Sequence, residues 1–186
     1  MKIVFFDTEF TGEHWKTTLV SIGMVNMEGD ELYITLNDYD QTQVSEWLQE
    51  NVLSKIDSAR SVDRETAYRQ ISDWLLNYSQ GGEIRLCSAG KGADMLLLFE
   101  LWEFSERDTS QDFHSLHDLP ECISHCAHLD LNTMFLIAGN EVPSDREKFL
   151  GLKPSQDRHD ALHDACVVRK CFMKLVKLDC FKALGV

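Results

Sequence analysis

The sequence predicts a single α/β domain in which helices cover a mixed sheet. Three strand-like segments lie between residues 2 and 36, and another at 83–89 is followed directly by a helix-like segment. The 186 residues are 44% hydrophobic, which is enough to bury a sizeable core. Because no repeat, low-complexity tract or linker interrupts the chain, we expect one domain spanning residues 1–186.

The N-terminal half begins with strands and continues with helices. Residues 2–7, KIVFFD, are β-branched and aromatic, and residues 17–36 hold two more apolar runs separated by the turn sequence MEGD. These three runs predict an antiparallel start to the sheet. Apolar side chains then recur at helical spacing, which predicts amphipathic helices at 41–56 and 63–78.

The second half alternates strands with helices. Residues 83–89, EIRLCSA, predict a buried strand, and residues 93–102 predict a helix that covers it. Residues 127–139 predict a short strand and then a helix capped near Asn132 and ended by Gly139. Polar loops are expected at 105–118 and 140–158. A long helix is expected from residue 160, with an apolar face formed by Ala161, Ala165, Val168, Phe172 and Leu175.

Charge and composition exclude several classes of protein. The net charge of −13 and the isoelectric point near 4.8 argue against a broad basic surface that coats long duplexes. No apolar run approaches the roughly 18 residues of a membrane span, and no secretory signal is recognisable. The six cysteines form no CxxC pair, which favours reduced thiols. We therefore expect a cytoplasmic protein without a membrane partner.

Two acids stand at the end of the first predicted strand. Asp7 and Glu9 are two residues apart, so on a strand they project to the same side, roughly 6.6 Å apart, while Thr8 points away. Two converging carboxylates repel each other unless a cation lies between them, and their hard oxygen atoms suit Mg²⁺ or Mn²⁺. The alternative is that both acids simply extend into solvent where the strand frays.

A second candidate group lies near the C-terminus in RHDALHDACVV. His159 and Asp164 are five residues apart, which on one helix is a rotation of about 140°, so both cannot face one site if both are helical. They can meet if His159 lies in the loop before the helix and Asp164 lies on its second turn. The alternative is that the acid only complements the helix dipole and the histidine lies on the surface.

Together the two segments resemble a known family of nucleases. FDTEFTG and HDALHDA are similar to the first and third motifs of the DEDDh branch of the DnaQ-like 3′-5′ exonuclease superfamily, which includes ribonuclease T and oligoribonuclease. The first motif, DxExTG, is matched by Asp7, Glu9, Thr11 and Gly12. The third motif, HxAxxDA, is matched by His159, Ala161, Asp164 and Ala165. The resemblance spans nearly the whole chain.

The family's second motif places an aspartate at the start of a helix that follows a strand. Asp94 has this position, directly before the apolar segment MLLLFEL. The chain departs from the commoner pattern four residues earlier, where Gly90 stands in place of an asparagine. The alternative role for Asp94 is that of a helix N-cap.

The resemblance implies a fold, a set of ligands and a reaction. The fold would be a ribonuclease H-like mixed five-stranded sheet flanked by helices. Asp7, Glu9, Asp94 and Asp164 would hold two divalent ions, Mg²⁺ or Mn²⁺, and His159 would take the proton from the attacking water, a task that suits imidazole. Residues beside these motifs would contact the substrate, namely Phe10, Thr11, Gly12, Lys91 and Arg158.

The implied activity is hydrolysis from the 3′ end of single-stranded RNA or DNA, with release of nucleoside 5′-monophosphates. Single-stranded RNA or a short oligonucleotide is favoured over a long duplex because the chain is small and acidic and carries no duplex-binding module. RNA is placed before DNA, although no residue of the sequence decides between them. The resemblance leaves a homodimer open. The alternative function is that of a non-catalytic nucleic-acid-binding or regulatory protein on the same fold. A crowded histidine and cysteine segment at 114–128 lacks a known order of zinc ligands, so a packed loop is preferred there.

Overall fold

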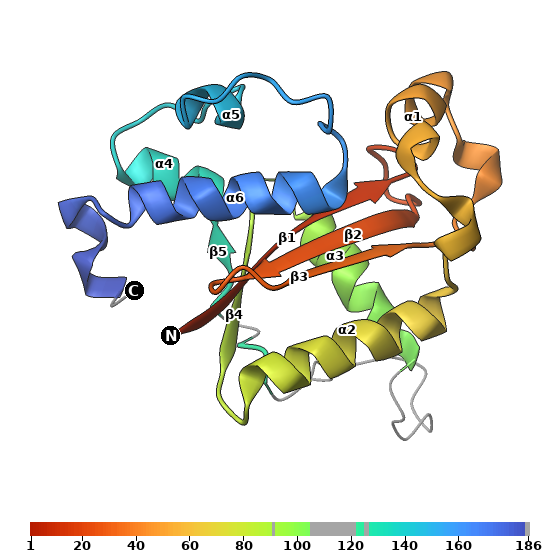
Figure 1. The fold of residues 1–186 in the computed structure, drawn as a ribbon, viewed down its shortest axis with the longest axis horizontal. Coiled ribbons are helices and arrows are strands. Elements are labelled where there is room, and N and C mark those ends of the chain that lie inside the picture. The colour runs from red at the N-terminus through yellow and green to blue at the C-terminus, as the bar shows by residue number, and fades with distance from the viewer. Residues whose placement is uncertain (91, 105–121, 125–126, 185–186) are drawn as a thin grey trace.

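A five-stranded mixed sheet in the order β3-β2-β1-β4-β5 forms the centre of the computed structural model, which describes residues 1–90, 92–104, 122–124 and 127–184 (Figure 1). The central strand β1 pairs antiparallel with β2 and parallel with β4. β2 and β3 are also antiparallel, so the predicted antiparallel start is confirmed. The strands are β1 Lys2–Phe10, β2 Leu19–Asn26, β3 Glu31–Thr35, β4 Ile84–Ser88 and β5 Leu129–Asp130.

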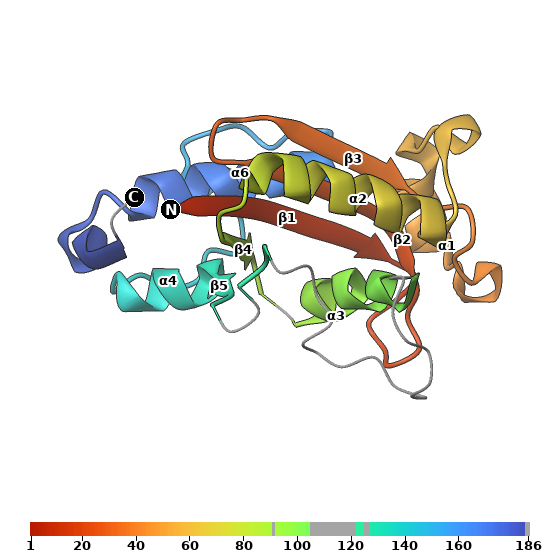
Figure 2. The ribbon, with the colours of Figure 1, turned by 90° about the horizontal axis from the view of Figure 1, so that it is seen from below.

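Helices cover both faces of the sheet. Figures 1 and 2 show α6 along one face and α2 along the other. Among the described residues, none of the helices has the length and hydrophobicity that crossing a membrane requires. The helices are α1 Glu46–Asn51, α2 Arg64–Ser79, α3 Ala93–Glu100, α4 Leu131–Ile137, α5 Arg146–Phe149 and α6 Ala161–Leu175.

Three sequence predictions need correction. The helix expected at 41–56 is only the short α1 between single 3₁₀ turns, because Asp40 and Ser45 each cap a separate turn with their side chains. α4 is capped by Asp130, which accepts from two backbone N–H groups, and not by Asn132. The loop expected at 140–158 contains α5. The other expected loop, 105–118, lies outside the described residues.

Alternation along β1 divides the core into two layers. Val4 and Phe6 pack with side chains of α2 and α3, whereas Ile3 and Phe5 pack with side chains of α4 and α6. All five residues predicted for the apolar face of the last helix are buried, as expected. Since successive residues of a strand point to opposite faces, the residues that continue β1 beyond Phe6 are divided between the same two layers.

The contact between α6 and the sheet depends on Gly23. This residue lies in β2 directly opposite Asp7 of β1. A Cβ atom added at Gly23 would lie 2.2 Å from the backbone nitrogen of Leu162 and 2.3 Å from the carbonyl carbon of Ala161. The first turn of α6 therefore rests on bare backbone, which brings the start of this helix close to the end of β1.

Candidate metal and catalytic site

The C-terminal end of β1 supplies the first two acids. Asp7 and Glu9 continue the series of Ile3 and Phe5, so they project toward the face that α6 covers. Both are partly buried, and the pairing with β2 becomes irregular directly after Glu9. The prediction that they share one side of a strand is confirmed, and the alternative that they fray into solvent is wrong.

The third acid and the histidine come from the start of α6. Asp160 caps this helix by accepting from the His163 N–H (2.9 Å), so Asp164 lies on the first turn and not on the second. His159 precedes the cap with a φ of +63°, and its backbone N–H donates to Asp164 Oδ2 (3.1 Å). The expected arrangement of a loop followed by a helix is therefore confirmed. The left-handed backbone at His159 is what turns the chain back toward Asp164.

Asp94 reaches the same edge of the sheet from the opposite layer. It lies in the first turn of α3 and is 7% exposed, and Thr8 Oγ1 donates to Asp94 Oδ1 over 2.6 Å. The N-cap of this helix is Gly92, so the alternative role of Asp94 as a cap is wrong. Because β1 and β4 are parallel, α3, which follows β4, starts near the C-terminal end of β1. The hydrogen bond from Thr8 joins β1 to α3 there.

The side chains of Glu9, His159 and Asp164 can each offer one ligand atom, and these atoms all lie within 4.8 Å of one another. Such a group of two carboxylates and an imidazole fits a divalent cation. Asp94 and Asp7 are linked to this cluster through their charges, because Asp94 raises the pKa of Glu9, and Glu9 and Asp164 raise the pKa of Asp7. Glu9, His159 and Asp164 therefore fit a divalent metal ion, and Asp7 and Asp94 are close enough to this group to be coupled to it electrostatically.

Electrostatics show how tightly these acids are gathered. Burial raises the pKa of Asp7 well above its usual range, and the charges of Asp94, Asp164 and Glu9 raise it further. Burial, followed by Asp164 and Asp94, raises the pKa of Glu9 to about 8. The pKa values of Asp94 and Asp164 are also raised, chiefly by burial. Without a cation, these carboxyl groups therefore keep their protons up to a higher pH than carboxyl groups in water do.

These shifts predict how stability depends on pH without metal. An acid whose pKa is higher in the folded than in the unfolded chain stabilises the fold fully below its unfolded pKa, near 4. That contribution is lost as the pH rises through the folded pKa, which for Glu9 is about 8. We expect the melting temperature in chelator to fall between pH 5.5 and 8.5. Because a metal ion displaces these protons, the upward shift caused by Mn²⁺ should grow over the same range.

The matched variant is Glu9→Gln, which removes the titrating group and keeps its shape. It should melt with a shallower dependence on pH in chelator than the wild type. Thermal melts across the pH series, at constant ionic strength, measure both slopes. Equal slopes in the two proteins would contradict the assignment of the raised pKa to Glu9.

Arg146 is a charged residue beside the candidate site that the sequence analysis did not single out. It opens α5, and its Nη2 donates to Ala89 O (3.3 Å) and to Asn132 Oδ1 (3.2 Å). Its positive charge lowers the pKa of Asp7 and of the other aspartates of the site. Its buried Nε has no hydrogen-bond partner among the described residues. Arg146 is thus a resident cation that partly offsets the repulsion among the carboxylates.

Replacing Arg146 with methionine should act on stability and metal binding in opposite directions. Without metal, the carboxylates lose their compensating charge, and we expect a loss of about 1–2 kcal/mol, or roughly 2–8 °C in melting temperature. With the positive charge gone, Mn²⁺ should bind several-fold more tightly. Calorimetric titration and thermal melts check both, with the exposed Arg60→Met as the matched control. Weaker Mn²⁺ binding in Arg146→Met would contradict this role.

The residues predicted to contact substrate have mixed surroundings. Thr11 is buried and donates to Gln43 Oε1 (2.5 Å), and Gly12 N–H donates to Thr17 Oγ1 (3.1 Å), so both shape the loop after β1. Arg158 pairs with Asp145 and Glu147 and is therefore engaged within the protein. Lys91 lies outside the described residues.

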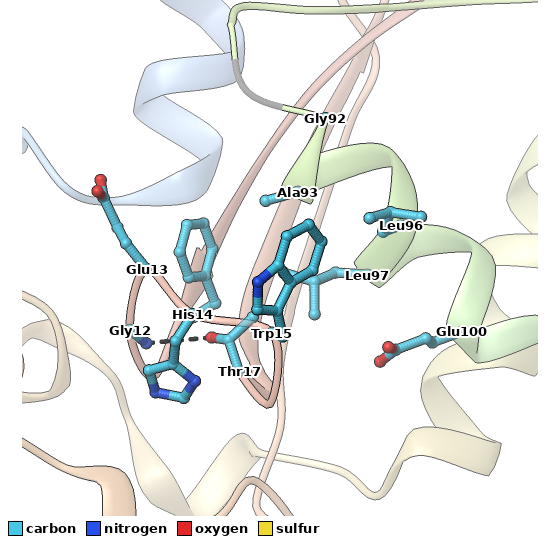
Figure 3. Close-up of a pocket in the computed structure, with 11 residues that line it drawn as sticks. Gly12, Glu13, His14, Trp15, Thr17, Gly92, Ala93, Leu96, Leu97 and Glu100 are labelled. Carbon is cyan, nitrogen blue, oxygen red and sulfur yellow. Dashed lines mark hydrogen bonds between the residues drawn. The ribbon is translucent and has the colours of Figure 1, made fainter.

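An apolar pocket of about 500 Å³ adjoins the end of β1 on the side of α3. Figure 3 shows the Trp15 ring extending toward α3, from which Ala93, Leu96 and Leu97 line the pocket. Trp15 is 98% exposed, so its ring is free to meet a ligand. Phe10 lines this pocket and also a second pocket of about 450 Å³. The second pocket is lined by Glu9, Trp47 and His159 as well. Two hollows thus flank the strand end that carries the acids.

Most of the histidine and cysteine segment at 114–128 lies outside the described residues. Of its described members, His128 shares a hydrogen bond with Ser88 Oγ (3.0 Å), and Cys122 is buried beneath the sheet. Burial lowers the pKa of His128, which favours its neutral form. Cys122 belongs to the apolar core, and His128 is partly buried beside β4.

A scan against protein-family models finds no model that matches this chain, and a search of curated proteins finds no match either. The resemblance to the nuclease superfamily therefore rests on the motif residues themselves. The distances and charges around these residues are independent of that resemblance, because they come from the folded chain.

Proposed function

We propose that the protein is a metal-dependent 3′-5′ exonuclease with a ribonuclease H-like fold, acting on single-stranded nucleic acid. The observation that carries the proposal is the convergence of Asp7, Glu9, Asp94, His159 and Asp164 at one end of β1. Buried acids that repel one another lower the stability of the fold unless a cation joins them. A strong functional reason is therefore needed for their presence together.

The chemistry assigns a role to each of these residues. Bound divalent ions supply a polarised water and compensate the charge that develops on the phosphoryl oxygens. The carboxylates of Asp7, Glu9, Asp94 and Asp164 would hold those ions. His159 would accept the proton from the attacking water, since a nitrogen of its ring lies within 4.8 Å of a carboxylate oxygen of Glu9 and of Asp164. The products of 3′-end cleavage would be nucleoside 5′-monophosphates.

The surroundings of the site favour a single-stranded end as substrate. The net charge of −13 opposes a long duplex, whereas a single terminal phosphate needs only local positive charge. The apolar pocket with Trp15 and Phe10 offers surfaces on which an unpaired base can stack. Among single strands we favour RNA.

The decisive experiment uses matched end-labelled RNA and DNA oligonucleotides, single-stranded and duplex, incubated with Mn²⁺ or chelator. We expect stepwise shortening from the 3′ end of single strands, in Mn²⁺ only, with the label of a 5′-labelled strand retained on the shortened product. Binding of the oligonucleotides without release of nucleotides would instead support the non-catalytic alternative.

His159→Ala should lower kcat by roughly 10²- to 10⁴-fold, the usual contribution of a general base. The upward shift of the melting temperature in Mn²⁺ should remain largely intact, because the carboxylates are unchanged. Added imidazole should restore part of the lost rate by replacing the missing base in the cavity. Assays with and without added imidazole measure this rescue. Loss of the Mn²⁺ shift would mean that His159 serves as a ligand instead.

A further inference from the structure

Glu147 is a buried carboxylate that lies outside the carboxylate cluster of the proposed site. It is 5% exposed, on the short helix α5, and three partners from the following segment surround it. The backbone N–H of Ser155 donates to both of its oxygens (3.0 and 3.2 Å). Arg158 Nε donates to Oε2 (2.6 Å), and His163 Nε2 lies 3.1 Å from Oε1.

Two of these partners immediately precede the proposed catalytic residues. Arg158 is followed by His159, and His163 is followed by Asp164. The Glu147 carboxylate therefore holds the chain at two points, one directly before His159 and one directly before Asp164. Since Asp164 Oδ2 also accepts from the His159 N–H, these contacts form a closed arrangement around the start of α6.

The His159 loop needs such support because its backbone is unfavourable. His159 has a φ of +63°, a conformation that a non-glycine residue holds only when its surroundings fix it. Arg158 is fixed by a second ion pair with Asp145 (2.5 Å), and its carbonyl accepts from Lys55 Nζ. On the other side, the His159 ring meets the Trp47 ring edge-on, with centroids 4.9 Å apart.

We propose that Glu147 is a positioning residue that holds His159 and Asp164 in their working geometry without touching substrate or metal. This inference rests on the proposed function. It also assigns Arg158 a role other than the predicted contact with substrate. Its Nε donates to Glu147 and its Nη2 donates to Asp145. A buried acid with this many donors is sensitive to loss of one charge, because its partners then lack an acceptor.

The test is Glu147→Gln, which keeps the shape but places an amide N–H₂ against groups that also donate. Residues that orient metal-site groups typically affect activity or metal affinity by 10- to 100-fold when changed. We expect kcat at saturating Mn²⁺ to fall by roughly 10- to 100-fold, while KM for a single-stranded oligonucleotide changes by less than about threefold. The matched control is the exposed Glu83→Gln, which carries the same charge change.

Measurements at a temperature well below the melting point of each variant separate positioning from simple stabilisation. If Glu147 only stabilises the loop, Glu147→Gln melts lower but keeps wild-type kcat and Mn²⁺ affinity, and that outcome overturns the inference. Should Glu147→Gln not fold, the second variant is Arg158→Met. It removes the hydrogen bond from Arg158 to Glu147, while Glu147 keeps its charge and its contact with His163. A wild-type kcat in folded Arg158→Met would likewise overturn the inference.

Hydrogen–deuterium exchange and calorimetry give readouts that do not require nuclease activity. In Glu147→Gln, the amides of residues 155–160 should exchange faster than in the wild type, and Mn²⁺ should bind at least tenfold more weakly because Asp164 is displaced. Wild-type protein without nuclease activity would contradict the proposed function alone. Unchanged exchange together with unchanged Mn²⁺ affinity would contradict the positioning role of Glu147 alone.

Discussion

Replacing Asp7 with asparagine is expected, under the proposed function, to remove nuclease activity, with a fall in kcat of roughly 10³-fold or more. A bound metal ion contributes several kcal/mol of charge stabilisation, and each 1.36 kcal/mol changes a rate about tenfold. Asp7 lies on the central strand, where the charges of Asp94, Asp164 and Glu9 all act on it, so its loss weakens the whole ligand set. Initial rates on a 3′-terminal single strand in Mn²⁺ measure the effect.

The same variant separates site binding from general screening of the acidic surface. At 100 times its dissociation constant, one ion binding only the folded wild type contributes about 2.7 kcal/mol, which corresponds to a shift of roughly 5–11 °C. Asp7→Asn should show a much smaller shift, and in chelator it should melt higher than the wild type only at a pH high enough to ionise the Asp7 carboxyl, whose pKa is raised. The exposed Asp73→Asn is the matched control. Equal Mn²⁺ shifts in all three proteins would contradict a metal site at Asp7.

Adding one methyl group at Gly23 is expected to disrupt the site without changing any of its ligands. The new Cβ would lie 2.2 Å from the Leu162 nitrogen, and backbone cannot relieve such a clash by changing rotamer. We expect Gly23→Ala to lose about 3 kcal/mol or more and to melt roughly 6–12 °C lower. With α6 displaced from β2, Asp164 moves away from Asp7, so activity and the Mn²⁺ shift should fall together.

The matched control for this substitution is Gly92→Ala. A Cβ at Gly92 has no neighbour within 4 Å in the described part of the chain, and its φ of −61° suits any residue. It should therefore melt within about 2–4 °C of the wild type, since only a modest change in helix capping is involved. A Gly23→Ala protein that melts like the wild type and keeps its Mn²⁺ shift would show that the close contact with α6 does not determine the site.

Local patterns predicted the parts of the site that depend on one element at a time. Strand alternation placed Asp7 and Glu9 on one side, and the five-residue spacing correctly required His159 to precede the helix of Asp164. The turn that carries Asp164 was predicted wrongly because Asp160, and no earlier residue, caps α6. Strand order and helix contacts, which bring Asp94 to the same edge, needed the folded chain.

The residues that were missed act through contacts between distant segments. Arg146 and Glu147 lie in a polar stretch where a helix of four residues leaves no periodic pattern. Arg158 was predicted to contact substrate, and its ion-pair partners Asp145 and Glu147 become its neighbours only when α5 packs beside α6. Gly23 did leave a signal, since a glycine within the apolar run LVSIGMVN indicates a close approach of another backbone.

The late position of α6 in the chain has a consequence for protein synthesis. A ribosome delivers β1 long before α6, and until α6 emerges, Ile3 and Phe5 lack the helix that buries them. The nascent sheet then exposes an apolar face, a state in which chaperones engage growing chains. Asp7 and Glu9 also lack Asp164 and His159 at this stage. Under the proposed function, a growing chain is therefore unable to degrade the messenger RNA from which it is being translated.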